Sequence, residues 1–210
     1  VQPGGDAATR DPTRMALAHA HDAGVLGRAV DRLAATPALV DVVTRQIETG
    51  LASVLTSSAG RLFDGVAAIV GVCRAASYEG QAAMLLEEAV REPAVASTPP
   101  IVTRLPDGML ELDTRPLILD AFEPGDAAAR FHAGLAALVT EAATTAAADA
   151  GLDRIALGGG VFANDLVTSS VAAGLTAAGL RVFLPRQVPV GDGGIALGQV
   201  LVANASRGRT

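Results

Sequence analysis

Two glycine-rich runs toward the end of the sequence carry the residues best suited to hold a phosphate or a metal. The first, Ile155 to Asn164, places Gly158, Gly159 and Gly160 at a predicted strand-to-helix junction. Glycine lets backbone N–H groups approach a bound group without a Cβ in the way, and a helix N-terminus adds a positive dipole. The run therefore predicts either a site for a nucleotide phosphate or ribose, or a turn needed only to pack the strand against the helix.

The second run, Val190 to Ile195, holds one carboxylate, Asp192, between glycines just before a predicted helix. Such a carboxylate can reach a metal or a phosphate-bound water while the neighbouring amides stay accessible. An Asp at this place can also simply cap the helix, and spacing alone favours the cap. Asp64 and Glu79, which lie on or at the start of predicted helices, present the same choice between a binding role and a solvated helix terminus.

Three histidines, one arginine and one cysteine are the remaining polar candidates. His19 and His21 are two residues apart, which directs them to different faces of a helix, and His132 stands alone on an Ala-rich helix. All three are interpreted as structural or surface groups. Arg61 could meet a phosphate, although a helix-surface arginine is the commoner case. Cys73, in an apolar run, is most simply a small buried hydrophobe.

The composition of the 210-residue chain excludes several chemistries. All 16 basic residues are arginine, so no lysine is present to serve as a P-loop clamp or a Schiff-base amine. A single cysteine excludes disulfides, CxxC redox pairs and cysteine-based zinc sites. The net charge of −6 argues against a nucleic-acid-binding surface, and no apolar stretch is long enough to span a membrane. We therefore expect a soluble, cytoplasmic protein, and a chain that opens with Val1 rather than Met is expected to be part of a longer one.

Hydrophobic periodicity divides the chain into a helix-rich first part and a second part in which strands and helices alternate. The first part is predicted to contain helices over 10–33 (broken near Gly24 or Gly27), from 36–37 onward, over 58–71, 78–90 and 124–150, a connector at 51–56, a hairpin of strands 101–105 and 109–113, and a short strand over 117–119. The second part is predicted as strand 154–157, helix 161–178, strand 181–184 and helix 195–203. This βαβα order makes the two strands parallel and the fold class α/β.

Five short runs stand out when the sequence is taken as a whole. They are Pro3–Ala8 (PGGDAA), Ser57–Asp64 (SSAGRLFD), Ser77–Ala83 (SYEGQAA), Gly158–Asn164 (GGGVFAN) and Asp192–Gln199 (DGGIALGQ). Each run is weak alone. In this order, over nearly the whole chain, they resemble the HypF family of hydrogenase maturation carbamoyltransferases.

The resemblance implies that 1–210 is the C-terminal lobe of a carbamoyl-transfer domain with the two-lobed, actin/Hsp70-like (ASKHA) ATPase fold. In that family carbamoyl adenylate is made from carbamoyl phosphate and ATP. The carbamoyl group then passes to the terminal cysteine of a partner protein, HypE, for the cyanide ligands of the NiFe centre. The lobe alone is expected to be inactive. Two alternatives stay open: a lobe of a tRNA threonylcarbamoyladenosine or antibiotic O-carbamoyltransferase, and a non-catalytic nucleotide-binding or docking module.

The resemblance also implies ligand-binding residues by their position in the runs. Those implied for ATP or carbamoyl adenylate are Asp64, Tyr78, Glu79, Gly80, Gly159, Gly160 and Asn164. The first four belong to the runs that would hold the ribose, and the last three would line the base and phosphates. Asp192 would ligate one divalent metal, Fe, Zn or Mg. The chain departs from the family in that Gly191 stands where Asn is usual, and no histidine-rich metal motif is present.

Overall fold

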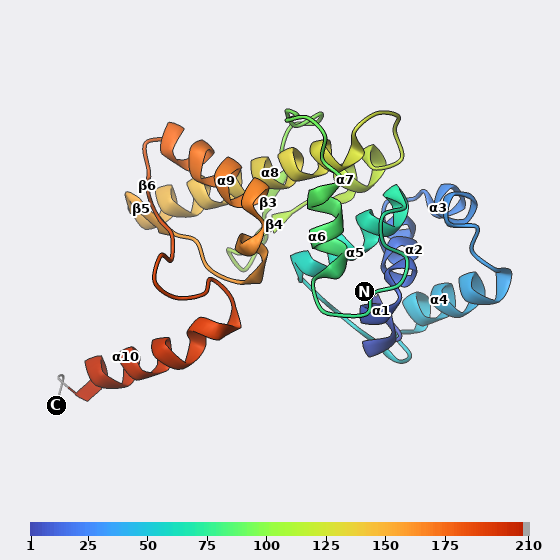
Figure 1. Ribbon diagram of the computed structural model, residues 1–210, viewed down its shortest axis with the longest axis horizontal. Coiled ribbons are helices and arrows are strands. Elements are labelled where there is room, and N and C mark those ends of the chain that lie inside the picture. Colours follow the sequence, from blue (N-terminus) through green and yellow to red (C-terminus); the bar gives the residue numbers. More distant parts are fainter. Residues whose placement is uncertain (208–210) are drawn as a thin grey trace. The chain divides into compact units, whose positions relative to one another are not determined.

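The computed structural model describes residues 1–207 (Figure 1). The chain divides into two compact units, the first Val1–Leu138 and the second beginning at Val139. Each unit is described by itself below. None of the helices in the described part of the chain is both long enough and apolar enough to cross a membrane.

The first unit is mainly helical and contains two small antiparallel strand pairs. Its helices are α1 (Asp6–Arg10), α2 (Pro12–Asp22), α3 (Leu26–Leu33), α4 (Pro37–Thr49), α5 (Ala59–Val70), α6 (Gln81–Glu88), α7 (Arg115–Asp120) and the first half of α8 (Ala127–Ala150). Its strands are β1 (Gln2–Pro3), paired with β2 (Ser53–Val54), and β3 (Val102–Arg104), paired with β4 (Leu110–Leu112).

Helices α2 and α5 form the centre of the first unit. The Asp11 carboxylate caps α2 by accepting from the Thr13 N–H at 3.1 Å. Gly65 marks the close approach of the two helices, because a Cβ there would lie 2.8 Å from the His19 ring and 3.3 Å from the Met15 backbone. Met15 and Phe63 are among the fully buried side chains of this core. The small residue at the crossing therefore fixes how α5 lies on α2.

Local signals in the first unit predict most element boundaries correctly. The Thr36 hydroxyl caps α4 by accepting from the Leu39 N–H, and α5 ends at Gly71, whose φ is +96°. The predicted break in the 10–33 helix falls at Gly24, which has a φ of +71°, whereas Gly27 lies inside α3. The hairpin is confirmed.

Four expectations for the first unit are wrong, the first being the start of the helix predicted over 124–150, which begins only at Ala127. The helix predicted over 78–90 begins only at Gln81, because Gly80 adopts a φ of +78°. Residues 117–119, expected as a strand, lie in α7, where Leu117 and Ile118 are buried; a three-residue apolar run cannot separate the two structures by periodicity. Within the predicted connector 51–56, strand β2 pairs with β1, a two-residue pairing with no sequence pattern to reveal it.

The second unit has the predicted alternation of strands and helices. It contains the second half of α8, β5 (Arg154–Ala156), the 3₁₀ turn η1 (Gly160–Ala163), α9 (Asp165–Ala177), β6 (Arg181–Phe183), the 3₁₀ turn η2 (Asp192–Gly194) and α10 (Ile195–Arg207). Strands β5 and β6 are parallel, as predicted. Helix α9 packs closely on α8, because a Cβ on Gly174 would lie 2.9 Å from the Thr140 side chain.

Two boundaries differ in the second unit. The helix predicted over 161–178 is split: η1 comes first, and α9 starts only after Asn164. The last helix, predicted to end at 203, continues to Arg207 and keeps several apolar side chains exposed. These are Ile195, Leu197, Val200, Leu201 and Val202.

Candidate functional site

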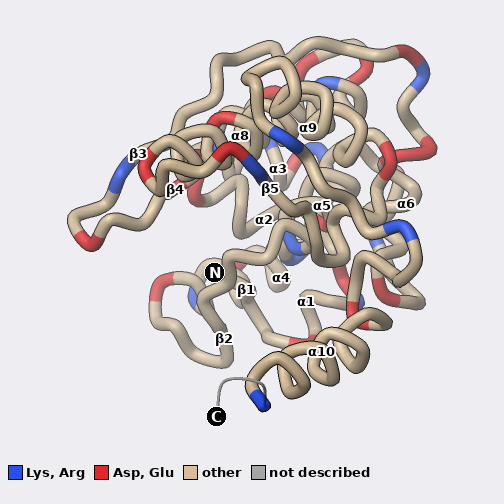
Figure 2. The backbone as a smooth tube through the Cα atoms, turned by 90° about the vertical axis from the view of Figure 1, so that its left-hand side faces the viewer, with Lys and Arg blue, Asp and Glu red and all other residues tan. Residues whose placement is uncertain are grey.

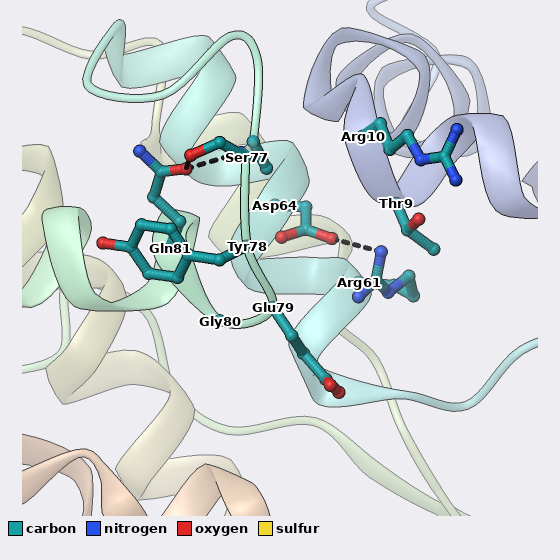
Figure 3. A pocket seen from close by; sticks show the side chains of 10 residues that line it. Thr9, Arg10, Arg61, Asp64, Ser77, Tyr78, Glu79, Gly80 and Gln81 are labelled. Atoms are coloured by element: carbon teal, nitrogen blue, oxygen red, sulfur yellow. Dashed lines mark hydrogen bonds and ion pairs between the residues drawn. The ribbon is translucent and has the colours of Figure 1, made fainter.

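A cavity of about 560 Å³ opens in the first unit where three segments meet (Figure 3). Its lining comes from the end of α1, the first turns of α5, and the loop that leads into α6. The lining residues are Thr9, Arg10, Arg61, Asp64, Ala76, Ser77, Tyr78, Glu79, Gly80 and Gln81. Both carboxylates and both guanidinium groups in this set are potential partners for a polar ligand.

Helix α5 places Arg61 and Asp64 on the same side, because residues three apart share a helix face. The helix starts after Ser58, whose carbonyl accepts from the N–H of Arg61 at 3.1 Å. Phe63, next to Asp64, points into the core, where its ring meets that of Phe131 edge-to-face at 4.9 Å between centroids. Helix α5 is therefore oriented about its axis so that Phe63 faces the apolar core while Arg61 and Asp64 face the cavity.

The loop from Gly71 to Gly80 brings the other wall. Its Ala76 N–H donates to the Arg10 carbonyl at 2.9 Å, which ties the loop to the end of α1. The Ser77 N–H and hydroxyl both donate to Gln81 Oε1, at 2.7 and 3.0 Å. Figure 3 shows the result: Asp64 and Arg61 face each other, and the Tyr78 ring points away from this pair.

The electrostatics of the cavity centre on Asp64. This residue is only 6 % exposed. Burial raises the pKa of its carboxyl group to about 6, and the positive charge of Arg61 opposes that rise. Arg61 Nη1 lies 2.7 Å from Asp64 Oδ2, yet neither atom makes a hydrogen bond of acceptable geometry with the described residues. Both atoms are buried against each other, so the contact is a charge-compensating ion pair at the wall of the cavity.

His19 and Cys73 lie close to the Asp64–Arg61 pair but do not add charge at neutral pH. Burial lowers the pKa of His19, whose Nε2 lies 3.3 Å from the Arg61 carbonyl oxygen and donates to it. Burial, and next the negative charge of Asp64, raise the pKa of the Cys73 thiol. His132 is buried beside Phe63 and Phe131, which confirms the structural interpretation of this residue.

The glycine-rich runs of the second unit lie beside one another. The Gly159 N–H donates to the Val190 carbonyl at 2.8 Å, and a Cβ on Gly191 would lie 3.6 Å from the Gly160 Cα. Gly159 itself has a φ of +103°, which favours glycine. The two predicted loops are thus tied together through the Gly159 N–H, and the backbone of Gly158, Gly159 and Gly160 stays exposed.

Asn164 and Asp192 behave differently at the helix starts that follow these loops. Asn164 is buried and caps α9, its side-chain oxygen accepting from the Val167 N–H at 2.9 Å. Asp192 is exposed at the start of η2, and no cap hydrogen bond forms there, although spacing alone favoured a cap. In residues 1–207 no group of three or more His, Cys, Asp or Glu side chains could hold a metal ion.

The predicted site residues therefore fall into two groups. Asp64, Tyr78, Glu79 and Gly80, from two separate sequence runs, line the cavity in the first unit. Gly159, Gly160, Asn164 and Asp192 belong to the adjoining loops of the second unit.

Sequence reasoning missed four polar residues that also line the cavity. They are Thr9, Arg10, Ser77 and Gln81. Ser77 and Gln81 lie in one of the five runs, and Arg10 follows another closely. The runs therefore marked these parts of the chain but did not single out these residues.

Known proteins similar to this chain confirm the resemblance seen in the five runs. Residues 1–199 match the family described as "Carbamoyltransferase, Kae1-like Domain, second subdomain". The chain belongs to the HypF carbamoyltransferase family. It is 40 % identical to the "Carbamoyltransferase HypF homolog" of Cupriavidus necator, over 96 % of this chain and 54 % of that protein. It is 41 % identical to the HypF of Rhizobium leguminosarum bv. viciae, over 94 % of this chain and 26 % of that protein.

The fold is likewise that of HypF. A crystal structure described as full-length HypF in the phosphate- and nucleotide-bound form matches 97 % of this chain with a TM-score of 0.87 and 27 % identity, covering 28 % of that chain. The predicted fold class, an α/β lobe of the actin/Hsp70-like type, is confirmed by this match. The chain spans about half the length of the first relative and about a quarter of the second.

Proposed function

We propose that this chain is the second lobe of a carbamoyl-transfer domain in hydrogenase maturation, and that its cavity holds the ribose of a nucleotide. One observation carries the proposal: two separate runs of the sequence bring Asp64 and the 78–80 segment to the same cavity, around a buried carboxylate. The nucleotide-bound state of the similar HypF structure supports it.

The cavity has the chemistry for a sugar with two neighbouring hydroxyl groups. Carboxylates of Asp64 and Glu79 are acceptors for ribose hydroxyl donors, and hydrogen bonds to a charged acceptor are about twice as strong as neutral ones. Gly80 presents backbone without a side chain at the rim, and the half-exposed Tyr78 offers an aromatic face. The ligand proposed here is ATP or carbamoyl adenylate.

In the second unit, the loops that contain Gly158–Gly160 and Asp192 lie beside each other, and the first of them is proposed to meet the base and phosphates. The exposed backbone at Gly159 and Gly160 lets a phosphate approach closely, because no Cβ blocks it, and the Gly160 amide is proposed as a donor, since the Gly159 N–H already donates to Val190. Asn164 would line the nucleotide from the position that its cap on α9 fixes.

Asp192 is proposed as a ligand of a divalent metal. It is an exposed carboxylate that forms no ion pair with the described residues, and an oxygen donor of this kind fits Mg²⁺, Fe²⁺ or Zn²⁺. A single carboxylate cannot complete a coordination sphere, so further ligands would come from outside this chain. When bound, such a metal would neutralise phosphate charge.

The reaction proposed for the full-length protein is transfer of a carbamoyl group from carbamoyl adenylate, made from carbamoyl phosphate and ATP, to the C-terminal cysteine of HypE in the cytoplasm. The residues of this chain bind and orient the nucleotide, and none is assigned to the chemical step. We expect the 210 residues alone to be inactive. The other carbamoyltransferase branches fit less well, because both relatives above are HypF proteins matched over nearly the whole chain.

Calorimetric titration of the full-length protein with ATP tests the proposal. Asp64→Asn and Glu79→Gln should each weaken binding about tenfold or more, the usual cost of losing a charged hydrogen-bond acceptor. Glu48→Gln is the matched control, because Glu48 is exposed on α4 and does not line the cavity. Unchanged affinity in both cavity variants would remove the cavity from the nucleotide site.

A further inference from the structure

The contact between Arg61 and Asp64 is not accounted for by hydroxyl binding alone. A lone carboxylate would suffice to accept from a hydroxyl group, yet α5 places a guanidinium directly on it. We propose that Arg61 is a positioning residue: it keeps the Asp64 carboxylate ionised and oriented at the cavity, so that hydroxyl recognition operates at neutral pH. This inference rests on the proposed nucleotide site and explains how its carboxylate stays ionised and oriented for a ligand.

The burial of both groups gives the first argument. Asp64 has a side chain 8 % exposed and Arg61 one 17 % exposed. Removing a carboxylate from water favours its protonated form, and burial is the larger of the two influences on the pKa of Asp64. The positive charge of Arg61 holds this pKa near 6, so the group is mostly ionised at neutral pH. Without that charge the same burial would leave it largely protonated.

The geometry gives the second argument. Nη1 and Oδ2 are 2.7 Å apart, but neither forms a properly aligned hydrogen bond. The contact therefore supplies charge compensation through Oδ2, one of the two oxygens of the carboxylate. Both residues belong to one helix, three positions apart, so their spacing is set by α5 itself. The His19 ring, which donates to the Arg61 carbonyl, anchors that turn against α2.

Among the described residues around the cavity, no other group can replace Arg61 in this role. Arg10, on α1, lines the cavity but is exposed to solvent. Glu79, on the loop, is also exposed, and its negative charge would favour the protonated form of Asp64 rather than the ionised one. Tyr78 points away from the pair (Figure 3). The buried His19 ring on α2 and the Cys73 thiol are both uncharged at neutral pH, since burial lowers the pKa of the first and raises that of the second.

The role of Arg61 is tested by the pH dependence of adenosine binding to the full-length protein, measured by calorimetry from about pH 5 to about pH 9. Adenosine carries the ribose diol but no phosphate, so the ligand does not titrate in this range. Wild-type affinity should fall as Asp64 becomes protonated, with a midpoint near the pKa of about 6. In Arg61→Met the midpoint should rise by about 1 to 3 pH units, the usual effect of an opposite charge in contact, and affinity should recover in alkaline solution.

Matched variants separate positioning from packing. Arg45→Met removes an exposed arginine from α4 and should leave the midpoint unchanged. If Arg61→Met does not fold, Arg61→Gln is judged by the same criterion. An equal loss of affinity at every pH would overturn the inference and assign Arg61 a packing role, and an unmoved midpoint would overturn it as well. Absence of adenosine and ATP binding in the wild type would instead overturn the proposed nucleotide site and this inference with it.

Discussion

The buried Asp64 carboxylate should cost the protein stability, and replacing it should make the fold stronger. The perturbation is Asp64→Asn, which keeps the shape of the side chain but cannot ionise. Burial raises the pKa of Asp64 from 3.8 to about 6. Each pKa unit corresponds to about 1.4 kcal/mol, so the ionised form is disfavoured in the folded state by about 3 kcal/mol at neutral pH.

The sign of the pH dependence follows from the direction of the shift. A carboxyl group whose pKa is higher in the folded state contributes nothing unfavourable below its unfolded pKa of 3.8, where both states are protonated. Its destabilising effect grows between about pH 4 and about pH 6 and stays constant above that. The variant lacks this effect, so its advantage should appear only as the pH rises.

Native-state hydrogen exchange on peptides from α5 measures this advantage locally within the full-length protein. Wild type and variant are compared at the same pH, which cancels the intrinsic exchange rate. At neutral pH the α5 amides of Asp64→Asn should exchange about a hundredfold more slowly, and near pH 4 about equally. Asp41→Asn, an exposed carboxylate on α4, is the control and should change little. Equal protection at neutral pH, or the same gain at acid pH, would refute the reasoning.

Three further outcomes follow from the packing and from the exposed metal candidate. Gly194→Ala places a Cβ 2.7 Å from the Pro189 carbonyl oxygen and should destabilise the second unit by about 1 to 3 kcal/mol in thermal denaturation, whereas Gly158→Ala meets open space and should cost less. Phe131→Ala should cost about 3 to 5 kcal/mol in chemical denaturation, because it empties a fully buried position and removes the edge-to-face contact with α5. Asp192→Ala should lower the metal content of the full-length protein by elemental analysis while adenosine affinity stays unchanged; full retention of metal would remove Asp192 as a ligand.

Features set by neighbouring residues could be predicted from the sequence, whereas features set by distant ones could not. The start of α4 at Thr36 and the end of α5 at Gly71 depend on a side-chain cap and a left-handed glycine, both readable locally. The course of the 71–80 loop, by contrast, depends on its hydrogen bond to α1, a contact between distant segments. The helix α7 was missed because its apolar run is too short to show a period.

The candidate site divides in the same way. Asp64 and Glu79 were predicted because they stand in recognisable runs. Arg10 was not, because it lies outside the five runs and lines the cavity only once the distant 71–80 loop packs beside the end of α1. The binding roles of the predicted residues remain predictions, tested by the variants above.

Acidic and basic residues alternate along the tube without a long stretch of one sign (Figure 2). The described residues therefore display no broad field of one sign that would steer a charged partner from a distance. Specific contacts such as those in the cavity must carry recognition instead.

The clamped position of Phe63 has a consequence for how a ligand enters. Its ring is held edge-to-face by Phe131, and Gly65 lets α5 lie directly on α2, so α5 cannot turn or slide without breaking core contacts. The opposite wall, residues 71–80, is held at several points, because the Ala76 N–H donates to the Arg10 carbonyl and the Arg74 guanidinium donates to the carbonyls of Arg32 and Leu33. Both walls of the cavity are therefore held in place by contacts within the first unit. A ligand should therefore meet a largely preformed site, with the buried Asp64 carboxylate as the fixed reference point on which it docks.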